Sequence, residues 1–212
     1  MSKLRASTFV MLLGALLAAP HGAAAMPEGD GTATAAAKAG LSLAIDEVLL
    51  VLRNSNSDTN GKLDRLQEIT DRRFNFPRMS KLVLGRNRRK LSDEQQVEFE
   101  REFRRHLTVT YGQRIESFAG EEIEIGAARL ERNGEVTVKT KLVGGSADGI
   151  LIDYRLRERE GSWQIIDVII EGVSLVQNFR AQIQEIVSSK GADQLIVVLR
   201  EKNNPGGGTG SN

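Results

Sequence analysis

Residues 163–180 read Trp163-Gln-Ile-Ile-Asp-Val-Ile-Ile-Glu-Gly-Val-Ser-Leu-Val-Gln-Asn-Phe-Arg180 and decide the fold, because an apolar strand passes directly into a capped helix. Side chains alternate between the two faces of a strand, so this strand is predicted to be apolar on both faces. One face is predicted to carry Trp163, Ile165 and Ile169, and the opposite face Ile166, Val168 and Ile170. Helices are expected on one face, and the other face requires a second apolar occupant. Ser174 and Gln177 fit a capping box, which places the helix start within a residue or two of Gly172.

Four helix-like segments precede this strand. Apolar residues recur at helical spacing in residues 35–54 and 60–73. Pro77 suits the first turn of a short third helix, and Gly85 suits its end. Ser92 with Gln95 forms a second capping-box pattern at the start of the longest helix. The apolar seam of that helix consists of Phe99, Phe103, Leu107, Tyr111 and Ile115.

Beyond Gly120 the apolar period changes from helical to two, which predicts four strands. Asn133-Gly134 predicts a tight hairpin turn and Glu160-Gly161 a weaker one, so the sheet is expected to be antiparallel. Two further helices follow, the second of them capped by Asp193. The predicted fold class is α+β, with an antiparallel sheet of four to five strands packed against about six helices.

The N-terminus has the pattern of an export signal. Lys3 and Arg5 precede an apolar run at residues 9–17, and small residues follow up to Ala25, where cleavage is predicted. The run is shorter than the roughly 20 residues that a transmembrane helix needs, so the mature chain is expected to be soluble. The predicted divisions are a signal peptide at 1–25, a flexible leader at 26–34, one α+β domain at 35–203 and a disordered tail at 204–212.

Composition excludes several classes of function. Cleavage would remove two of the 29 basic residues and none of the 28 acidic ones, and the resulting net charge of −1 argues against a nucleic-acid binder. The chain has no cysteine, which excludes disulfides and thiolate zinc sites. His106 would be the only remaining histidine, and its place on an apolar seam predicts a structural role. No glycine-rich phosphate loop lies between a strand and a helix, so no cofactor or metal is expected.

Asp167 is the candidate titratable group, because it interrupts the apolar strand. A buried acid with a raised pKa would act as a general base. A structural hydrogen bond or an ion pair with Arg155 explains the residue better, since no partner set for catalysis is visible. Tyr111 and Tyr154 are candidate donors to an oxyanion or a lipid headgroup, or core residues with the hydroxyl at the edge.

Residues 72–90, here called the basic window, contain eight basic residues and no acid. Such a patch would approach an anionic headgroup, an anionic leaflet or an acidic protein, and each basic residue adds on the order of 1 kcal/mol near a charged membrane. The alternative is a solvated face paired with Glu98, Glu100 and Glu102. The same window also contains the apolar residues Phe74, Phe76, Met79 and Leu82. This mixture favours the edge of a binding site that is both basic and apolar.

Motifs spread over residues 40–202 together resemble the MlaC family of periplasmic phospholipid-binding proteins, also called the toluene-tolerance family. In chain order the matching motifs are Phe74-Asn-Phe76, Leu84-Gly-Arg86, Leu91-Ser-Asp-Glu-Gln95, Phe99 with Phe103, Leu107 with Thr110-Tyr111, Asp153-Tyr-Arg-Leu156, Trp163 with Asp167-Val168, and Glu171-Gly-Val-Ser-Leu-Val-Gln-Asn-Phe-Arg180. The chain departs from the family at Asn75, where an acid is usual, and at Arg88, where an aromatic residue is usual. A hopanoid-associated branch, HpnM, is similar, so a rigid polycyclic lipid stays open as cargo.

The resemblance implies a non-enzymatic periplasmic carrier that binds phospholipid acyl chains in an internal cavity, inside a strongly curved sheet of the NTF2-like cone type. Its implied partners are an inner-membrane lipid ABC transporter complex and an outer-membrane lipoprotein complex. Each buried methylene contributes about 0.8 kcal/mol and a two-chain lipid has roughly 30, so a deep cavity is required rather than a surface patch. The expected cavity residues are Phe74, Phe76, Met79, Leu82, Phe103, Leu107, Tyr111, Val138, Ile152, Tyr154, Val168 and Ile170. The expected headgroup or docking residues are Arg72, Arg78, Arg86, Arg88 and Arg89.

Two functions of other classes stay open at this stage. A small-molecule isomerase or hydrolase would use Asp167 as the base and a tyrosine as the electrophile. An interaction adaptor would have a filled core and would dock through the basic window.

Overall fold

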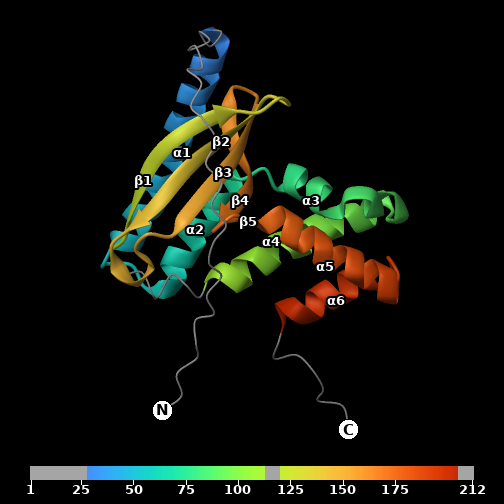
Figure 1. Ribbon diagram of the computed structural model, residues 1–212. Coiled ribbons are helices and arrows are strands. Elements are labelled where there is room, and N and C mark those ends of the chain that lie inside the picture. The colour runs from blue at the N-terminus through green and yellow to red at the C-terminus, as the bar shows by residue number, and fades with distance from the viewer. Residues whose placement is uncertain (1–27, 113–119, 205–212) are drawn as a thin grey trace, which may run out of the picture.

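The computed structural model describes residues 28–112 and 120–204 of the chain (Figure 1). The predicted signal peptide, the first leader residues, Ile115 and the tail from residue 205 lie outside the described residues. The elements in chain order are α1 Glu28–Arg53, α2 Thr59–Arg73, α3 Phe76–Leu84, the 3-10 helix η1 Gly85–Lys90, α4 Asp93–Gly112, β1 Glu122–Leu130, β2 Glu135–Val143, the 3-10 helix η3 Gly145–Ala147, β3 Leu151–Arg159, β4 Ser162–Ile170, β5 Val173–Ser174, α5 Leu175–Lys190 and α6 Gln194–Asn203.

Helix α1 begins at Glu28, inside the segment 26–34 that the sequence predicted as a leader. Alanine is the best helix former, and the alanine-rich stretch that follows Gly31 outweighs the helix-weakening glycines near the start. The first helix is therefore longer than expected and reaches well past the sheet (Figure 1).

The described strands form one five-stranded antiparallel sheet in the order β1-β2-β3-β4-β5, which confirms the predicted α+β class. Both predicted hairpin turns are present. Gly134 has a φ of 77° in the first, and Glu160 and Gly161 have φ values of 52° and 76° in the second. Such left-handed angles cost glycine nothing, which explains the presence of Gly134 and Gly161 in these turns.

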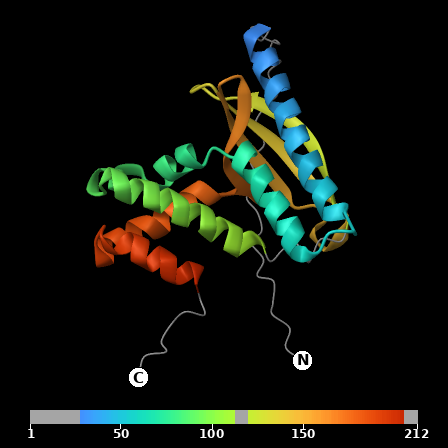
Figure 2. The same cartoon turned by 180° about the vertical axis from the view of Figure 1, so that it is seen from behind.

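The sheet is not strongly curled, so the expected NTF2-like cone is wrong. Helices α1 and α2 lie across one face of the sheet, while α3, α4, α5 and α6 gather at the side where β4 and β5 lie (Figures 1 and 2). Helix α1 has 26 residues and contacts β1, β2, β3 and β4. One helix thus covers four of the five strands. Helices, rather than a curled sheet, close the interior.

The apolar residues of strand β4 are not divided between its two faces as predicted. Ile166 is an extra residue in the pairing with β3, because Arg155 lies opposite Asp167 and Leu156 lies opposite Ile165. This β-bulge shifts the alternation of side chains by one residue. Apolar residues from both predicted faces therefore share one face, namely Trp163, Ile165, Val168 and Ile170.

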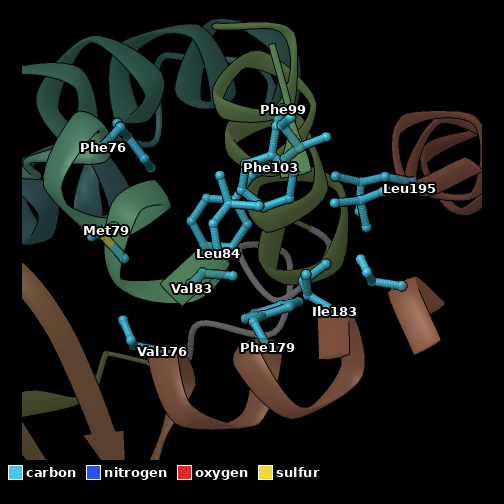
Figure 3. Close-up of a cluster of buried hydrophobic side chains, with 13 residues drawn as sticks. Phe76, Met79, Val83, Leu84, Phe99, Phe103, Val176, Phe179, Ile183 and Leu195 are labelled. Atoms are coloured by element: carbon cyan, nitrogen blue, oxygen red, sulfur yellow. The ribbon is translucent and has the colours of Figure 1, made fainter. Parts of the chain in front are cut away.

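Two apolar cores hold the molecule together. The helical core lies among α3, α4, α5 and α6 (Figure 3) and consists of Phe76, Met79, Val83, Leu84, Leu91, Phe99, Phe103, Val176, Phe179, Ile183, Val187, Leu195 and Leu199. The sheet core lies between α1 and the sheet and consists of Ala37, Leu41, Ile45, Val136, Val138, Leu156, Ile165 and Val168. Phe74 and Leu175 pack against both cores. These two residues mark the junction between them.

Both capping serines predicted from the sequence cap their helices. The Ser92 N–H donates to Gln95 Oε1 (2.9 Å) and the Gln95 N–H donates to Ser92 Oγ (3.2 Å), which completes the first capping box. Ser174 Oγ accepts from the Gln177 N–H (3.0 Å) at the start of α5. The predicted Asp193 cap is wrong, because Asp193 has helical backbone angles and its carboxylate accepts from Gln95 Nε2 instead (3.3 Å). Asp193 thus joins the start of α6 to the start of α4.

The Asp167 carboxylate joins the sheet to α5. The residue has 0% exposed surface, and its oxygens accept from Arg155 Nη2 (2.8 Å), Ser174 Oγ (2.6 Å) and the Val176 N–H (3.1 Å). The bulge turns Asp167 toward these donors and away from the apolar face. One carboxylate therefore fixes β3, β4 and the first turn of α5. The structure supports the ion pair with Arg155 that the sequence favoured over a general base.

We predict that Asp167→Asn lowers the free energy of unfolding by about 3 kcal/mol, because the neutral amide removes the buried charge that Arg155 Nη2 contacts at 2.8 Å and leaves Arg155 only its longer contact with Glu135 (3.7 Å). Urea denaturation followed by circular dichroism measures this change. Asp153→Asn, on the neighbouring strand, is the matched control and should change stability by less than about 0.5 kcal/mol. Equal stabilities of the two variants would contradict the role given to Asp167.

Candidate functional site

A cavity of about 390 Å³ lies between the helical core and the sheet core. Its size is within the range of roughly 300–1,000 Å³ that is usual for ligand pockets. The wall is formed by Leu41, Ala44, Ile45, Val48, Leu63, Leu66, Gln67, Ile69, Thr70, Arg73, Phe74, Phe76, Met79, Leu107, Thr108, Ile123, Ile152, Tyr154, Ile165, Val168, Ile170 and Leu175. These residues come from α1, α2, α3, α4, β1, β3, β4, α5 and the α2–α3 connection. The wall is almost entirely apolar.

Eight of the twelve expected cavity residues lie in this wall, namely Phe74, Phe76, Met79, Leu107, Ile152, Tyr154, Val168 and Ile170. Three others lie in or against the cores. Phe103 stacks on Phe99 in the helical core, Leu82 packs against the same core, and Val138 is fully buried in the sheet core. The side chain of Tyr111 lies outside the described residues.

The sequence did not assign the α1 and α2 residues of the wall to the cavity. Their helical stripes were visible, with Leu41, Ile45 and Val48 on one helix and Leu63, Leu66 and Ile69 on the other. A stripe shows that one face of a helix is covered. Whether the cover is protein or empty space depends on how α2 lies over the sheet, which the stripe does not specify.

The wall contains five polar residues, namely Gln67, Thr70, Arg73, Thr108 and Tyr154. The two threonine hydroxyls donate to carbonyl groups of their own helices, Thr70 to Gln67 (2.9 Å) and Thr108 to Arg104 (3.3 Å). The Tyr154 hydroxyl has no hydrogen-bond partner within residues 28–112 and 120–204. Burial raises the pKa of this hydroxyl to about 12, so it stays protonated at neutral pH. Tyr154 therefore presents a neutral donor to the inside of an apolar cavity.

Arg73 is paired with Glu47 of α1. Its Nε and Nη2 atoms donate to the two oxygens of Glu47 at 3.1 and 2.6 Å, and Arg72 Nη2 lies 3.5 Å from the same carboxylate. The hydrogen bond from Arg73 is the main cause that lowers the pKa of Glu47, with the charges of Arg73 and Arg72 adding to it. The same hydrogen bond raises the pKa of Arg73. Glu47 and Arg73 are therefore both charged at neutral pH.

The five expected headgroup or docking residues do not form one patch. Arg72 lies beside the cavity, and Arg78 contacts Glu135 of β2 (3.6 Å). Arg86, Arg88 and Arg89 are exposed on η1. This 3-10 helix follows the C-terminal end of α3, whereas the cavity-lining Phe76 is at the N-terminal end of α3.

The suggested pairing of the basic window with acids of α4 is not seen for Glu98 and Glu102. Both of these acids contact Arg101 and Arg200 instead. The basic window is continuous in sequence but divided in space.

His106 has the structural role that its position predicted. Its Nδ1 lies 2.8 Å from Asn203 Oδ1, and its ring meets Phe179 edge to face. Among the residues that the structure describes, no group of histidines and acids is arranged to hold a metal ion. None of the helices in this part of the chain is both long and apolar enough to cross a bilayer.

Comparison with known proteins identifies the family. The sequence profile of the MlaC protein family matches residues 43–201. The chain belongs to the MlaC family. Members of this family are lipid-binding carriers and not enzymes, which is the class of protein that the sequence predicted.

Two known proteins resemble this MlaC-family chain. The toluene tolerance protein ttg2D of Pseudomonas putida is 25% identical over 138 residues, which are 65% of this chain and 64% of that protein. The match thus spans less than two thirds of the relative's length. A phospholipid-binding protein from Ralstonia solanacearum, solved in complex with a phospholipid, superposes with a TM-score of 0.72 at 22% identity over 80% of this chain and 97% of that one. This second likeness establishes a shared fold.

We predict that ionisation of Tyr154 destabilises the protein at alkaline pH. The folded-state pKa of about 12 exceeds the ordinary value of 10.0, so the unfolded chain loses its proton first and stability falls as the pH rises from 10 to 12. The loss attributable to Tyr154 at pH 11 is about 1.4 kcal/mol. Urea denaturation of the native protein and of Tyr154→Phe at pH 8 and pH 11 measures it, and the Phe variant should lack this part of the loss. Equal losses in the two proteins would show that the hydroxyl is not buried.

Proposed function

We propose that this protein is a periplasmic phospholipid carrier that holds acyl chains in the cavity between its two cores. The observation that carries the proposal is the apolar cavity of about 390 Å³ whose wall comes from both cores and from α2. Membership of the MlaC family supports it, as does the solved relative with a bound phospholipid. The export-signal pattern at residues 1–25 supports the periplasmic location.

The wall has the chemistry that an acyl chain requires. Transfer of each methylene from water to an apolar surface stabilises the complex by about 0.8 kcal/mol. Lining side chains such as Leu63, Leu66, Ile152 and Ile170 border the cavity and are only half-buried. Because protein does not fill this space, the cavity is available to hydrocarbon.

The alternatives from the sequence receive less support. An adaptor with a filled core does not account for the apolar cavity. An isomerase or hydrolase with Asp167 as base does not account for a carboxylate that already accepts three hydrogen bonds. A hopanoid-type polycyclic lipid suits the same apolar wall, so the identity of the cargo is a matter for experiment.

The proposed route of the cargo follows the family. We propose that the carrier exchanges lipid with an inner-membrane lipid ABC transporter complex and an outer-membrane lipoprotein complex. The expected docking residues Arg78, Arg86, Arg88 and Arg89 are candidates for these contacts. The three on η1 are exposed and lie apart from the cavity, which suits contact with a protein partner better than contact with cargo.

Native mass spectrometry of protein purified from the periplasm tests the proposal. We expect mass additions that dissociate as phospholipid. A hopanoid mass would favour the polycyclic branch, and protein that is ligand-free in repeated preparations would contradict both forms of the carrier.

We predict that Ala44→Phe reduces phospholipid binding at least tenfold, because the benzyl group enters the space that the chain would occupy. Ala44 lines the cavity and is 6% exposed. Leu50→Phe is the matched control on the same helix, since Leu50 is 74% exposed and lies outside the wall. Binding is measured by displacement of a fluorescent lipid, with thermal unfolding monitored by circular dichroism to verify folding. Unchanged binding by a folded Ala44→Phe protein would place the lipid elsewhere.

A further inference from the structure

Arg73 is the only charged residue in the wall of the cavity, within the part of the chain that the structure describes. It is the last residue of α2, and it lies between Thr70 and Phe74, which also line the wall. Its partner Glu47 precedes Val48, another wall residue on α1. The ion pair thus lies where α1 and α2 meet beside the cavity.

This ion pair is at the rim of the cavity and not deep inside it. The side chains of Arg73 and Glu47 are 24% and 35% exposed, and that of Arg72 is 57% exposed. Apolar residues continue inward from the same two helices, with Ile45 on α1 and Ile69 on α2. A chain-bearing ligand whose tails occupy the cavity would place its polar end near such a rim.

The cluster has more positive than negative charge. Two guanidinium groups, those of Arg72 and Arg73, share the single carboxylate of Glu47 at 3.5 Å and 2.6 Å. The local excess is one positive charge, which a phosphodiester monoanion would neutralise. A guanidinium group binds carboxylate and phosphate with the same paired N–H geometry, so a phosphate is a direct competitor of Glu47.

We propose that Arg72 and Arg73 bind the phosphate of the lipid headgroup, and that Glu47 occupies Arg73 when no lipid is bound. The inference rests on the proposed carrier function and deepens it, because it names the anionic phosphodiester as the recognised group. The sequence placed Arg72 among the headgroup residues and did not single out Arg73 or Glu47. The low pKa of Glu47 keeps this competitor ionised at neutral pH.

The proposal predicts opposite effects for two variants. Arg72→Gln removes one phosphate partner, and we expect it to weaken binding of dioleoyl phosphatidylglycerol about tenfold. Glu47→Gln removes the competing carboxylate, and we expect it to strengthen binding of the same lipid several-fold. Dioleoylglycerol has the same chains and no phosphate, so both variants should bind it within twofold of the native protein. Arg65→Gln, a charge change on the same helix as Arg72 at a side chain that is 73% exposed and lies outside the wall, is the control and should bind both lipids like the native protein.

These measurements separate the proposal from its alternatives. If Glu47→Gln weakens both lipids alike, the ion pair only joins α1 to α2 and the proposal is overturned. If Arg72→Gln binds phosphatidylglycerol like the native protein, the proposal is also overturned. If the native protein binds neither lipid, the carrier function itself fails.

Inorganic phosphate tests whether chains are needed for recognition. Calorimetric titration of the native protein with inorganic phosphate alone should show no binding at millimolar concentration, because the phosphate must be brought to Arg73 by chains held in the cavity. Binding of free phosphate as tight as that of phosphatidylglycerol would assign the site to a soluble anion and would refute recognition of a lipid headgroup.

Discussion

The buried carboxylate of Asp167 is the interaction on which the rest of the structure depends. Its three donors belong to β3, to the residue that caps α5 and to the first turn of α5. A lone ionised group in such a position would be very costly, and here Arg155 and two hydrogen bonds compensate it. Because α5 carries much of the helical core while β4 carries part of the sheet core, this carboxylate also sets where the two cores lie relative to each other.

Much of the fold could be predicted from the sequence, because its signals are local. The capping serines at 92 and 174, the turn glycines at 134 and 161 and the change of period near residue 120 each act within a few residues of chain. The bulge at Ile166 was not predictable in this way, since it exists only in the pairing of β4 with β3. A prediction based on even alternation along β4 therefore assigned several side chains to the wrong face of the sheet. The expected strong curl of the sheet was wrong as well.

The residues of the candidate site could likewise be predicted from the sequence only in part. Phe76 and Phe103 both lie on apolar stripes of helices, yet only Phe76 borders the cavity while Phe103 is inside the helical core. Periodicity shows that a side chain is covered and does not show by what. Charge is similar, because the basic window is continuous along the chain but its members face Glu47, Glu135 or solvent. The pairing of Arg73 with Glu47 joins residues 26 positions apart, which no local pattern specifies.

Phe74 and Leu175 pack against both cores and also border the cavity between them. A bound acyl chain would pack against these two residues from the cavity side. The lipid and the two cores would then form one continuous apolar interior. Ligand that binds only the folded state stabilises it in proportion to the logarithm of its concentration over Kd. The empty carrier is then the form that opens more often to proteases. The lifetime of the protein would therefore depend on the fraction of molecules that hold lipid.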